Sequence, residues 1–390
     1  MTFTHHPWRA LAALALTVGL TVSCGGVDSG GTGQTVQTSS SGRISGFGSV
    51  IVNGVRFDDA QAAIVDDEGL ARVRADLKLG MVVDVEGEVH GNSGNGVARR
   101  IQFGNEIAGP VQAVDTAASR LTVLGQVVQV DVDTLFSGYN RGLADAVAGD
   151  LVEVFAFYDT NTAVYMATRI ERKTSLASFK LRGRISGLSN TSFALGGALI
   201  DYSSIAPPAL PRLANGLSVR VSLQTLPVAG RWVATSVHTS QRNFPDTSDA
   251  ELEGFIGSFV SAASFQVGGV LVDASGPGVD FRHGSINQLA NGTRVEVEGQ
   301  IRNGVLVARQ VDFKRGGGGD QEFELHGAIE SVNATARSFV LRGVTVAYDT
   351  GTAFSGGTAA NLVVGAQLEA KGAPSPGGAG LQASRIKFER

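Results

Sequence analysis

Basic side chains are concentrated in one short stretch of this 390-residue chain. Residues 169–184 (RIERKTSLASFKLRGR) contain one acid, Glu171, and six bases, which are Arg169, Arg172, Lys173, Lys180, Arg182 and Arg184. Such a cluster can bind the phosphate or sulfate groups of lipid headgroups, lipopolysaccharide or nucleic acid. The alternative interpretation is a solvated linker whose arginines flank strands. The formal net charge of −4 argues against a polyanion-binding surface over the whole chain.

Aromatic side chains that could stack on bases or sugars are scarce. Once an N-terminal signal containing Trp8 is removed, Trp232 and five tyrosines remain as the tryptophan and tyrosine content. Because binding of single-stranded nucleic acid relies on aromatic stacking, this composition argues against nucleic acid as a partner.

Residue patterns typical of metal or catalytic sites are missing from the sequence. The histidines beyond the signal, His90, His238, His283 and His326, are far apart and have no ligand spacing, so isolated surface histidines and no metal are predicted. The acids Asp58, Asp59, Asp66, Asp67 and Glu68 lack the spacing of a calcium loop and are expected to be solvated. No Gly-x-Ser-x-Gly motif occurs. We therefore predict no catalytic residue, no cofactor and no enzymatic activity.

Cys24 carries the clearest chemical signal. A basic region ends at Arg9, and the mostly apolar residues 10–22 are too few to span a bilayer, which predicts a secretory signal over 1–23. The following TVSCGG resembles a bacterial lipobox, although Thr21 occupies a position where leucine is usual. The resemblance implies cleavage before Cys24 and a lipid on its sulfur, so the membrane is an expected partner and the cell envelope the expected location. Ordinary secretory cleavage, which leaves a free thiol, is the alternative.

Cys24 is also the single cysteine of the chain, so no intramolecular disulfide can form. Gly, Ser and Thr dominate the residues that follow it. This composition predicts that 24–41 comprises the anchor cysteine and a flexible tether with a reach of about 20 to 25 Å.

A repeat organises the remainder of the chain. The octets GMVVDVEG (80–87) and GTRVEVEG (292–299) are nearly the same, and three intermediate or later copies complete a set of five. Each copy begins with a glycine, continues with a glycine-tipped hairpin and an alternating strand, and closes with Ala-x-x-Ile or Ala-x-x-Val. The predicted modules cover 42–103, 106–172, 180–240, 250–313 and 322–390.

Alternation within each copy predicts an all-β fold of five tandem small barrels, each about 60 to 70 residues long. Val83 and Val85 are expected to face a core, with Asp84 and Glu86 on the wet face. Five strands with a connector after the third, such as SINQLANG (285–292), follow the order of an OB-type barrel. Three acid and arginine pairs are expected to face each other across the last hairpins, namely Asp84 with Arg100, Glu153 with Arg169, and Glu369 with Arg385.

The glycine, hairpin and Ala-x-x-Ile frame resembles an uncharacterised β-rich domain found in tandem in predicted bacterial lipoproteins and other secreted proteins. The resemblance implies an architecture and a location, but no chemistry. Copy three departs most from the frame. Pro207, Pro208 and Pro211 occupy its connector, and Arg220 stands where the other copies have an acid.

Three functions are compatible with these patterns. The first is a non-catalytic envelope lipoprotein whose modules form a structural, spacer or interaction array, with an envelope protein as a partner. The second is an OB-like module that binds an anionic polymer or surface through the basic stretch 169–184. The third is an envelope hydrolase with a site at a junction between modules.

Overall fold

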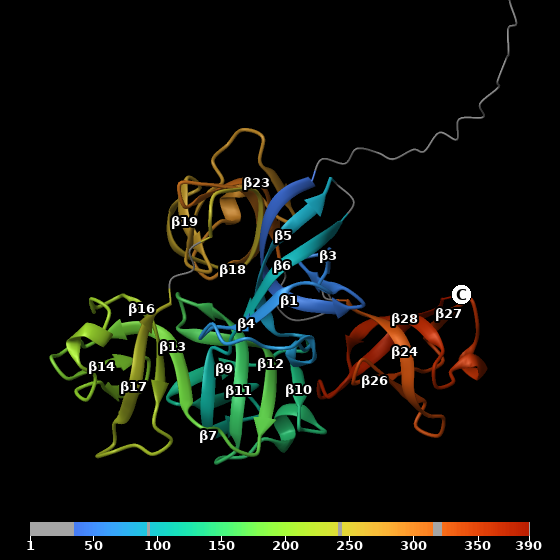
Figure 1. The fold of residues 1–390 in the computed structure, drawn as a ribbon, viewed down its shortest axis with the longest axis horizontal. Helices are drawn as coiled ribbons and strands as arrows, with labels where there is room; N and C mark the ends of the chain where they lie inside the picture. Colours follow the sequence, from blue (N-terminus) through green and yellow to red (C-terminus); the bar gives the residue numbers. More distant parts are fainter. Residues whose placement is uncertain (1–34, 92–93, 241–243, 315–321, 390) are drawn as a thin grey trace, which may run out of the picture. The chain divides into compact units, whose positions relative to one another are not determined.

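Strands dominate the protein, which is represented by a computed structural model that describes residues 35–91, 94–240, 244–314 and 322–389. The described residues form 29 strands and five short 3-10 helices, so the all-β prediction is confirmed (Figure 1). Gln34–Arg390 forms one compact unit. Among the described residues, no helix is long and apolar enough to cross a membrane.

Module one is a closed ring of five strands. Its strands are β1 (Thr35–Phe47), β2 (Val50–Val52), β3 (Val55–Asp58), β5 (Val82–His90) and β6 (Asn95–Phe103). Antiparallel pairing joins β1 to β2, β2 to β3, β6 to β5 and β5 to β1, and a parallel pairing of β3 with β6 closes the ring. The connector contains β4 (Ala63–Asp66) and η1 (Arg74–Asp76). This is the strand order expected of an OB-type barrel.

The same ring recurs in the other four modules. Module two contains β7 (Ile107–Asp115), β8 (Arg120–Val123), β9 (Gln126–Gln129), β10 (Leu135–Ser137), η2 (Gly142–Asp145), β11 (Leu151–Asp159) and β12 (Val164–Lys173). Module three contains β13 (Phe179–Ser186), β14 (Ser192–Leu195), β15 (Ala198–Asp201), η3 (Pro207–Ala209), β16 (Ser218–Leu223) and β17 (Trp232–Thr239).

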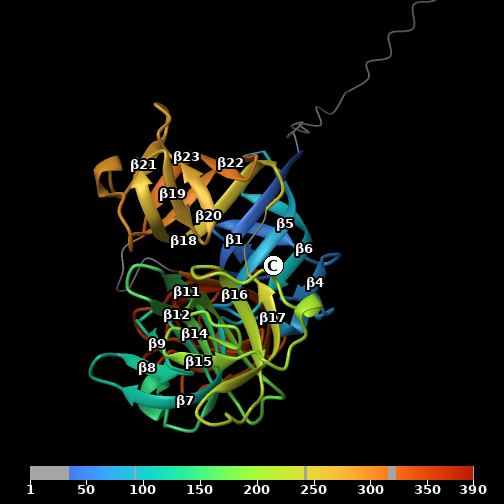
Figure 2. The ribbon, with the colours of Figure 1, turned by 90° about the vertical axis from the view of Figure 1, so that its left-hand side faces the viewer.

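Module four contains β18 (Thr247–Ser261), β19 (Ser264–Val267), β20 (Val270–Asp273), β21 (Asp280–Arg282), η4 (Ile286–Gln288), β22 (Arg294–Arg302) and β23 (Val305–Phe313). Module five contains β24 (Phe323–Asn333), β25 (Ser338–Leu341), β26 (Val344–Ala347), β27 (Ala353–Ser355), η5 (Ala359–Asn361), β28 (Gln367–Pro374) and β29 (Leu381–Phe388). The connector SINQLANG (285–292) contains η4. Figure 2 shows the strands of module four curling around one barrel.

The last glycine of the repeated octet is required by a bulge. A Cβ on Gly87 would lie 2.2 Å from the carbonyl oxygen of Val97, and one on Gly299 would lie 2.1 Å from that of Val307. In both hairpins the register shifts at this glycine. Glycine is therefore repeated because the opposite strand approaches too closely for any side chain.

The alternating side chains pack as predicted. Val83 and Val85 are buried and Glu86 is exposed. One aromatic from the second or third strand fills several barrel interiors, and the fully buried examples are Phe57, Phe193, Phe265 and Phe339. Burying each of these rings contributes roughly 1.5 to 3 kcal/mol to stability.

The bulges also correct the predicted cross-strand pairs. Asp84 lies opposite Gln102 rather than Arg100. The turn accounts for one position of this shift, because Val89 pairs with Gly96, and a bulge next to Gly87 accounts for the other. The same displacement puts Glu153 opposite Glu171 and Glu369 opposite Lys387. The three predicted acid and arginine pairs are therefore wrong, since locating them from the midpoint of the hairpin assumed an uninterrupted ladder.

The predicted tether is wrong from Thr35 onward, because β1 begins there and not at Gly42. Thr35 to Arg43 pair antiparallel with β5, and Thr38 to Ser41 also pair parallel with β18 of module four. Their buried hydroxyls are hydrogen-bonded: Thr38 donates to Asp249 at 2.9 Å and Ser41 donates to Asp84 at 2.6 Å. A polar segment can thus form a buried strand when each hydroxyl has a partner. Residues 1–34, including the predicted signal and Cys24, lie outside the described residues.

Pairing between modules extends the sheets beyond single barrels. In addition to its contact with β18, β1 pairs parallel with β24 of module five through Gly46 and Phe47. β7 of module two pairs antiparallel with β13 of module three. Strand edges that a separate barrel would expose are therefore covered by neighbouring modules.

Candidate binding pocket

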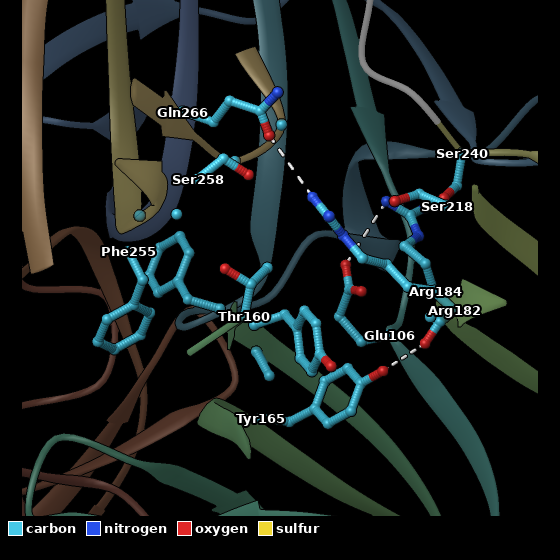
Figure 3. A pocket seen from close by; sticks show the side chains of 18 of the residues that line it. Glu106, Thr160, Tyr165, Arg182, Arg184, Ser218, Ser240, Phe255, Ser258 and Gln266 are labelled. Atoms are coloured by element: carbon cyan, nitrogen blue, oxygen red, sulfur yellow. Dashed lines mark hydrogen bonds and ion pairs between the residues drawn. The ribbon is translucent and has the colours of Figure 1, made fainter. Parts of the chain in front are cut away.

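A cavity of about 290 Å³ lies among modules two, three and four (Figure 3). Module two contributes Tyr158 and Tyr165 together with Glu106, which precedes β7. β13 of module three contributes Arg182 and Arg184, and β18 of module four contributes Phe255. Alternation along β13 places both arginines on the same side of the strand, because residues two apart face the same way.

Arg182 is held by carboxylates at the rim of this cavity. Its guanidinium lies 3.4 Å from Asp67 Oδ2 and 3.5 Å from Glu106 Oε1. Burial opposes its charge, but Glu106 and Asp67 outweigh that effect and raise the pKa of Arg182. The Nε atom is buried and has no hydrogen-bond partner. Arg182 is therefore a fixed cation with one unused donor.

Two tyrosines lie next to Arg182 in the lining of the cavity. The Tyr165 hydroxyl donates to the Arg182 carbonyl oxygen (Figure 3). The rings of Tyr158 and Tyr165 lie 4.6 Å apart between centroids. Burial raises the pKa of both tyrosines, and for Tyr165 the carboxylate of Glu106 adds to the effect. Both hydroxyls thus stay protonated at neutral pH.

Arg184 and Ser240 leave polar groups available at the same cavity. Arg184 is exposed, and its guanidinium makes one long hydrogen bond of 3.5 Å, to Gln266 Oε1. Within the described residues Arg184 forms no ion pair with a carboxylate. The Ser240 hydroxyl is buried and has no partner.

The other four cations of the predicted basic cluster are engaged in ion pairs. Arg169 pairs with Glu171 at 2.5 Å, Arg172 with Asp150 at 2.6 Å, Lys173 with Glu153 at 2.8 Å, and Lys180 with Glu68 at 2.7 Å. Of the six predicted residues, the structure brings Arg182 and Arg184 together at the cavity. The cluster is not one open surface.

The expectation that the acids of module one are solvated is wrong for three of them. Asp59 is buried against Arg74, and Asp66 is buried against Arg72. The Asp67 carboxylate lies 2.9 Å from Arg220 and 3.9 Å from Lys180, in addition to Arg182. Arg220 is the position where module three replaces an acid by a base. The change from an acidic to a basic residue at this position was the one feature of the sequence that indicated an acidic partner elsewhere in the chain.

Comparison with known families identifies the repeat. A family described as a domain of unknown function (DUF5666) matches residues 19–102, 108–171, 253–312 and 326–387. The chain belongs to this family. No curated protein matches the chain significantly. Four repeated DUF5666 domains therefore correspond to modules one, two, four and five.

Module three lies between the DUF5666 matches but has the same ring of strands. β13 pairs with β14 and β16, and a parallel pairing of β15 with β17 closes the ring. Its connector differs from those of the DUF5666 domains, because prolines form η3 and no short extra strand precedes it. Module three also supplies both arginines of the cavity.

A charged cluster in the last DUF5666 domain was missed by the sequence analysis. Glu324, His326 and Glu369 place one ligand atom each within 4.8 Å of one another, in an arrangement that could hold a metal. However, Lys371 lies 3.0 Å from Glu324 and 3.4 Å from Glu369, and Arg56 of module one also pairs with Glu324. These cations already occupy the carboxylates. The expectation of isolated surface histidines is wrong for His326.

Hydrogen bonding within this cluster fixes its charges. The hydrogen bond to Glu324 raises the pKa of His326, against the opposing effect of burial. Burial acts to raise the pKa of Glu324, but hydrogen bonds from His326, Arg56 and Lys371 outweigh it and lower the value to about 2. His326 Nδ1 lies 3.0 Å from Glu389 Oε1. The arrangement is therefore an ion-pair network that joins modules one and five.

Proposed function

We propose that this chain is an exported, lipid-anchored and non-catalytic scaffold of the cell envelope, in which DUF5666 domains form a structural or interaction array. The observation that carries the proposal is the pairing of β1 with strands of modules four and five, in addition to its own barrel. A chain of independent spacers would not need such contacts. A fixed assembly of modules suits a scaffold, because it presents surfaces in constant relative positions.

Ion pairs between modules support the same proposal. Arg220 of module three reaches Asp67 of module one, and Arg56 of module one reaches Glu324 of module five. Arg294 of module four lies over the ring of Phe157 in module two, 5.1 Å from its centroid. Partly buried pairs of this kind fix the geometry between partners more than they add stability.

The lipid anchor rests on the signal-like residues 1–23 and on Cys24. We expect Cys24→Ser to move the protein from the membrane fraction to the soluble fraction, because a serine cannot accept the thioether-linked lipid. Fractionation and labelling with a radioactive fatty acid measure this, and Ser29→Ala, which lies outside the TVSCGG stretch, serves as a control that keeps the thiol. A wild-type protein that never incorporates the label would show that the anchor is wrong.

The anionic-polymer alternative predicts salt-sensitive retention on heparin or lipopolysaccharide, because polyanion binding releases counterions. Five of the six predicted cations, all except Arg184, already pair with carboxylates, so such binding would have to compete with those pairs. The hydrolase alternative requires a nucleophile beside a base. In the described lining of the cavity, neither Ser218 nor Ser240 hydrogen-bonds a histidine or a carboxylate, which supports binding rather than hydrolysis.

A further inference from the structure

We infer that the cavity among modules two, three and four binds a small organic anion, whose acid group is held by Arg184, Arg182 Nε and the Ser240 hydroxyl. The carbon body of the ligand would pack against Tyr158 and Phe255. This inference goes beyond the scaffold role and does not depend on the lipid anchor, because it concerns groups that all lie within the described modules.

Unused polar atoms are the first support. Buried polar atoms in folded proteins nearly always have a partner, and leaving one unpaired costs roughly 1 to 3 kcal/mol. Arg182 Nε and Ser240 Oγ are both buried, both lack a partner and both belong to residues that line this one cavity. An acceptor such as a carboxylate or phosphate oxygen would satisfy both atoms. A cation would leave Arg182 Nε unpaired, because the guanidinium offers only donors.

The local charges favour an anion. The carboxylates of Glu106, Asp67 and Glu68 are matched by Arg182, Arg220 and Lys180 through ion pairs. Arg184 is a fourth cation and has no carboxylate partner within the described residues. Figure 3 shows its guanidinium reaching toward Gln266, and this single hydrogen bond leaves the other guanidinium donors without a partner in the described lining of the cavity. The excess positive charge is therefore carried by Arg184.

Glu106 is the one carboxylate in the described lining, and it does not cancel this excess. Its Oε1 already faces the guanidinium of Arg182 at 3.5 Å. An incoming acid group would approach Arg184 and Ser240, which line the cavity together with Glu106. The predicted order of importance is therefore Arg184 first and Ser240 second.

Size and lining limit the ligand to a small molecule with a ring or a short carbon skeleton. A volume of about 290 Å³ corresponds to roughly ten water molecules at about 30 Å³ each. Aromatic walls such as Tyr158 and Phe255 suit the face of a sugar or an aromatic ring. A monosaccharide acid and a benzoate-like acid both meet these limits.

Calorimetric titration of the purified full-length exported protein tests the inference. The probes are glucuronate and benzoate, with glucose and benzamide as uncharged counterparts and inorganic phosphate as an anion without a carbon body. We expect at least one organic acid to bind, and its neutral counterpart to bind at least about tenfold more weakly, which is about 1.4 kcal/mol.

Arg184→Gln should weaken binding of that acid by about tenfold or more, since it removes the unpaired cation. Ser240→Ala should weaken it about threefold to tenfold by removing a neutral hydrogen bond. The matched control is Arg302→Gln, which removes an equally exposed arginine in β22, outside the described lining. Thermal unfolding of each variant establishes that it is folded.

Three outcomes would overturn the inference. In the first, neither organic acid binds at about 10 mM, the upper limit of a weak specific site. In the second, the neutral counterparts bind as tightly as the acids, or Arg302→Gln loses as much affinity as Arg184→Gln. In the third, inorganic phosphate binds as tightly as the organic acids. This would show that the aromatic side chains of the cavity do not contribute to binding.

Discussion

Two junctions between modules use charged residues in opposite ways. At the junction of modules one and five, the carboxylate of Glu324 is met by Arg56, Lys371 and His326. At the junction around the cavity, Arg182 Nε and the Ser240 hydroxyl remain without a partner. The ion-pair network around Glu324 is complete in the protein alone, although Arg43 Nε at the same junction, over the ring of Phe323, also lacks a hydrogen-bond partner. The two unpaired atoms at the cavity belong to residues that line it, and by the inference above a ligand would complete that junction.

The difference indicates where function is located in an array of similar barrels. The barrels repeat the same ring with a bulge in the last hairpin, and modules one, four and five have glycine at that bulge, so the barrels supply a common frame. The junctions, in contrast, differ in sequence and chemistry. Buried polar groups that remain unpaired at a junction lower the stability of the fold, and no structural role explains them. We therefore expect ligand recognition at the incomplete junction and mechanical cohesion at the complete one.

The largest effect on stability is expected from Asp67→Asn, which would remove a negative charge from the junction around the cavity. The Asp67 carboxylate is almost fully buried and faces Arg220, Lys180 and Arg182, so its neutralisation leaves Arg220 without a carboxylate partner and removes one of the two carboxylates near Lys180 and Arg182. We expect a loss of about 3 kcal/mol in the free energy of unfolding, measured by urea denaturation. Asp280→Asn, in an exposed pair with Arg282, should change it by less than about 0.5 kcal/mol. Similar losses in both variants would contradict the proposed importance of Asp67.

A pH-dependent effect is expected at the complete junction. Because the pKa of His326 is raised in the folded protein, its contribution is fully present below the ordinary value of 6.5 and disappears as pH rises through the raised value. His326→Gln should therefore lower stability by about 1 kcal/mol at pH 5 and by much less at pH 9. The control is His238→Gln, which replaces an exposed histidine outside this network.

Glu324 makes the stability of the same junction depend on pH in the acidic range as well. Its pKa is lowered to about 2, so its contribution is present above the ordinary value of 4.5 and is lost as pH falls toward 2. Wild type should lose stability over this range more steeply than Glu324→Gln, as followed by circular dichroism melts. Parallel pH profiles for the two proteins would be inconsistent with the network.

The smallest effects on stability are expected from the substitution of two serines. Ser240→Ala removes a buried hydroxyl without a partner and should leave stability unchanged or raise it by up to about 1 kcal/mol. Ser41→Ala removes the donor to Asp84 and should lower stability by about 1 kcal/mol or more. Urea denaturation of both variants measures the difference. A clear loss of stability in Ser240→Ala would indicate that its hydroxyl already serves the protein alone.

Sequence reasoning was correct for features that residues within a single module determine. The burial of Val83 and Val85 and the OB-type strand order follow from alternation and glycine positions within one copy. It failed where the cause lies in another module. The strand at Thr35–Ser41 has the composition of a linker, and it is ordered by β5 and β18 rather than by its own residues.

The candidate pocket was only partly accessible to sequence reasoning. The basic stretch 169–184 drew attention to Arg182 and Arg184, but composition cannot distinguish a cation paired with a distant acid from an unpaired one. Glu106 and Ser240 lie in linkers between strands and carry no pattern of their own. Arg220 was noticed as a departure, yet its partner Asp67 is 153 positions away in the sequence.

The position of β1 has a consequence for the order in which the protein can fold. β1 is made first, yet Ser41 pairs with Leu252 and Phe47 pairs with Leu325, so its outer neighbours are synthesised much later. Until those modules emerge, the outer edge of the first barrel is an unprotected template for another chain. A chain that stops after module four would keep that edge open at Gly46 and Phe47. Module five thus covers this part of β1, and we expect a product truncated before module five to aggregate through its first strand.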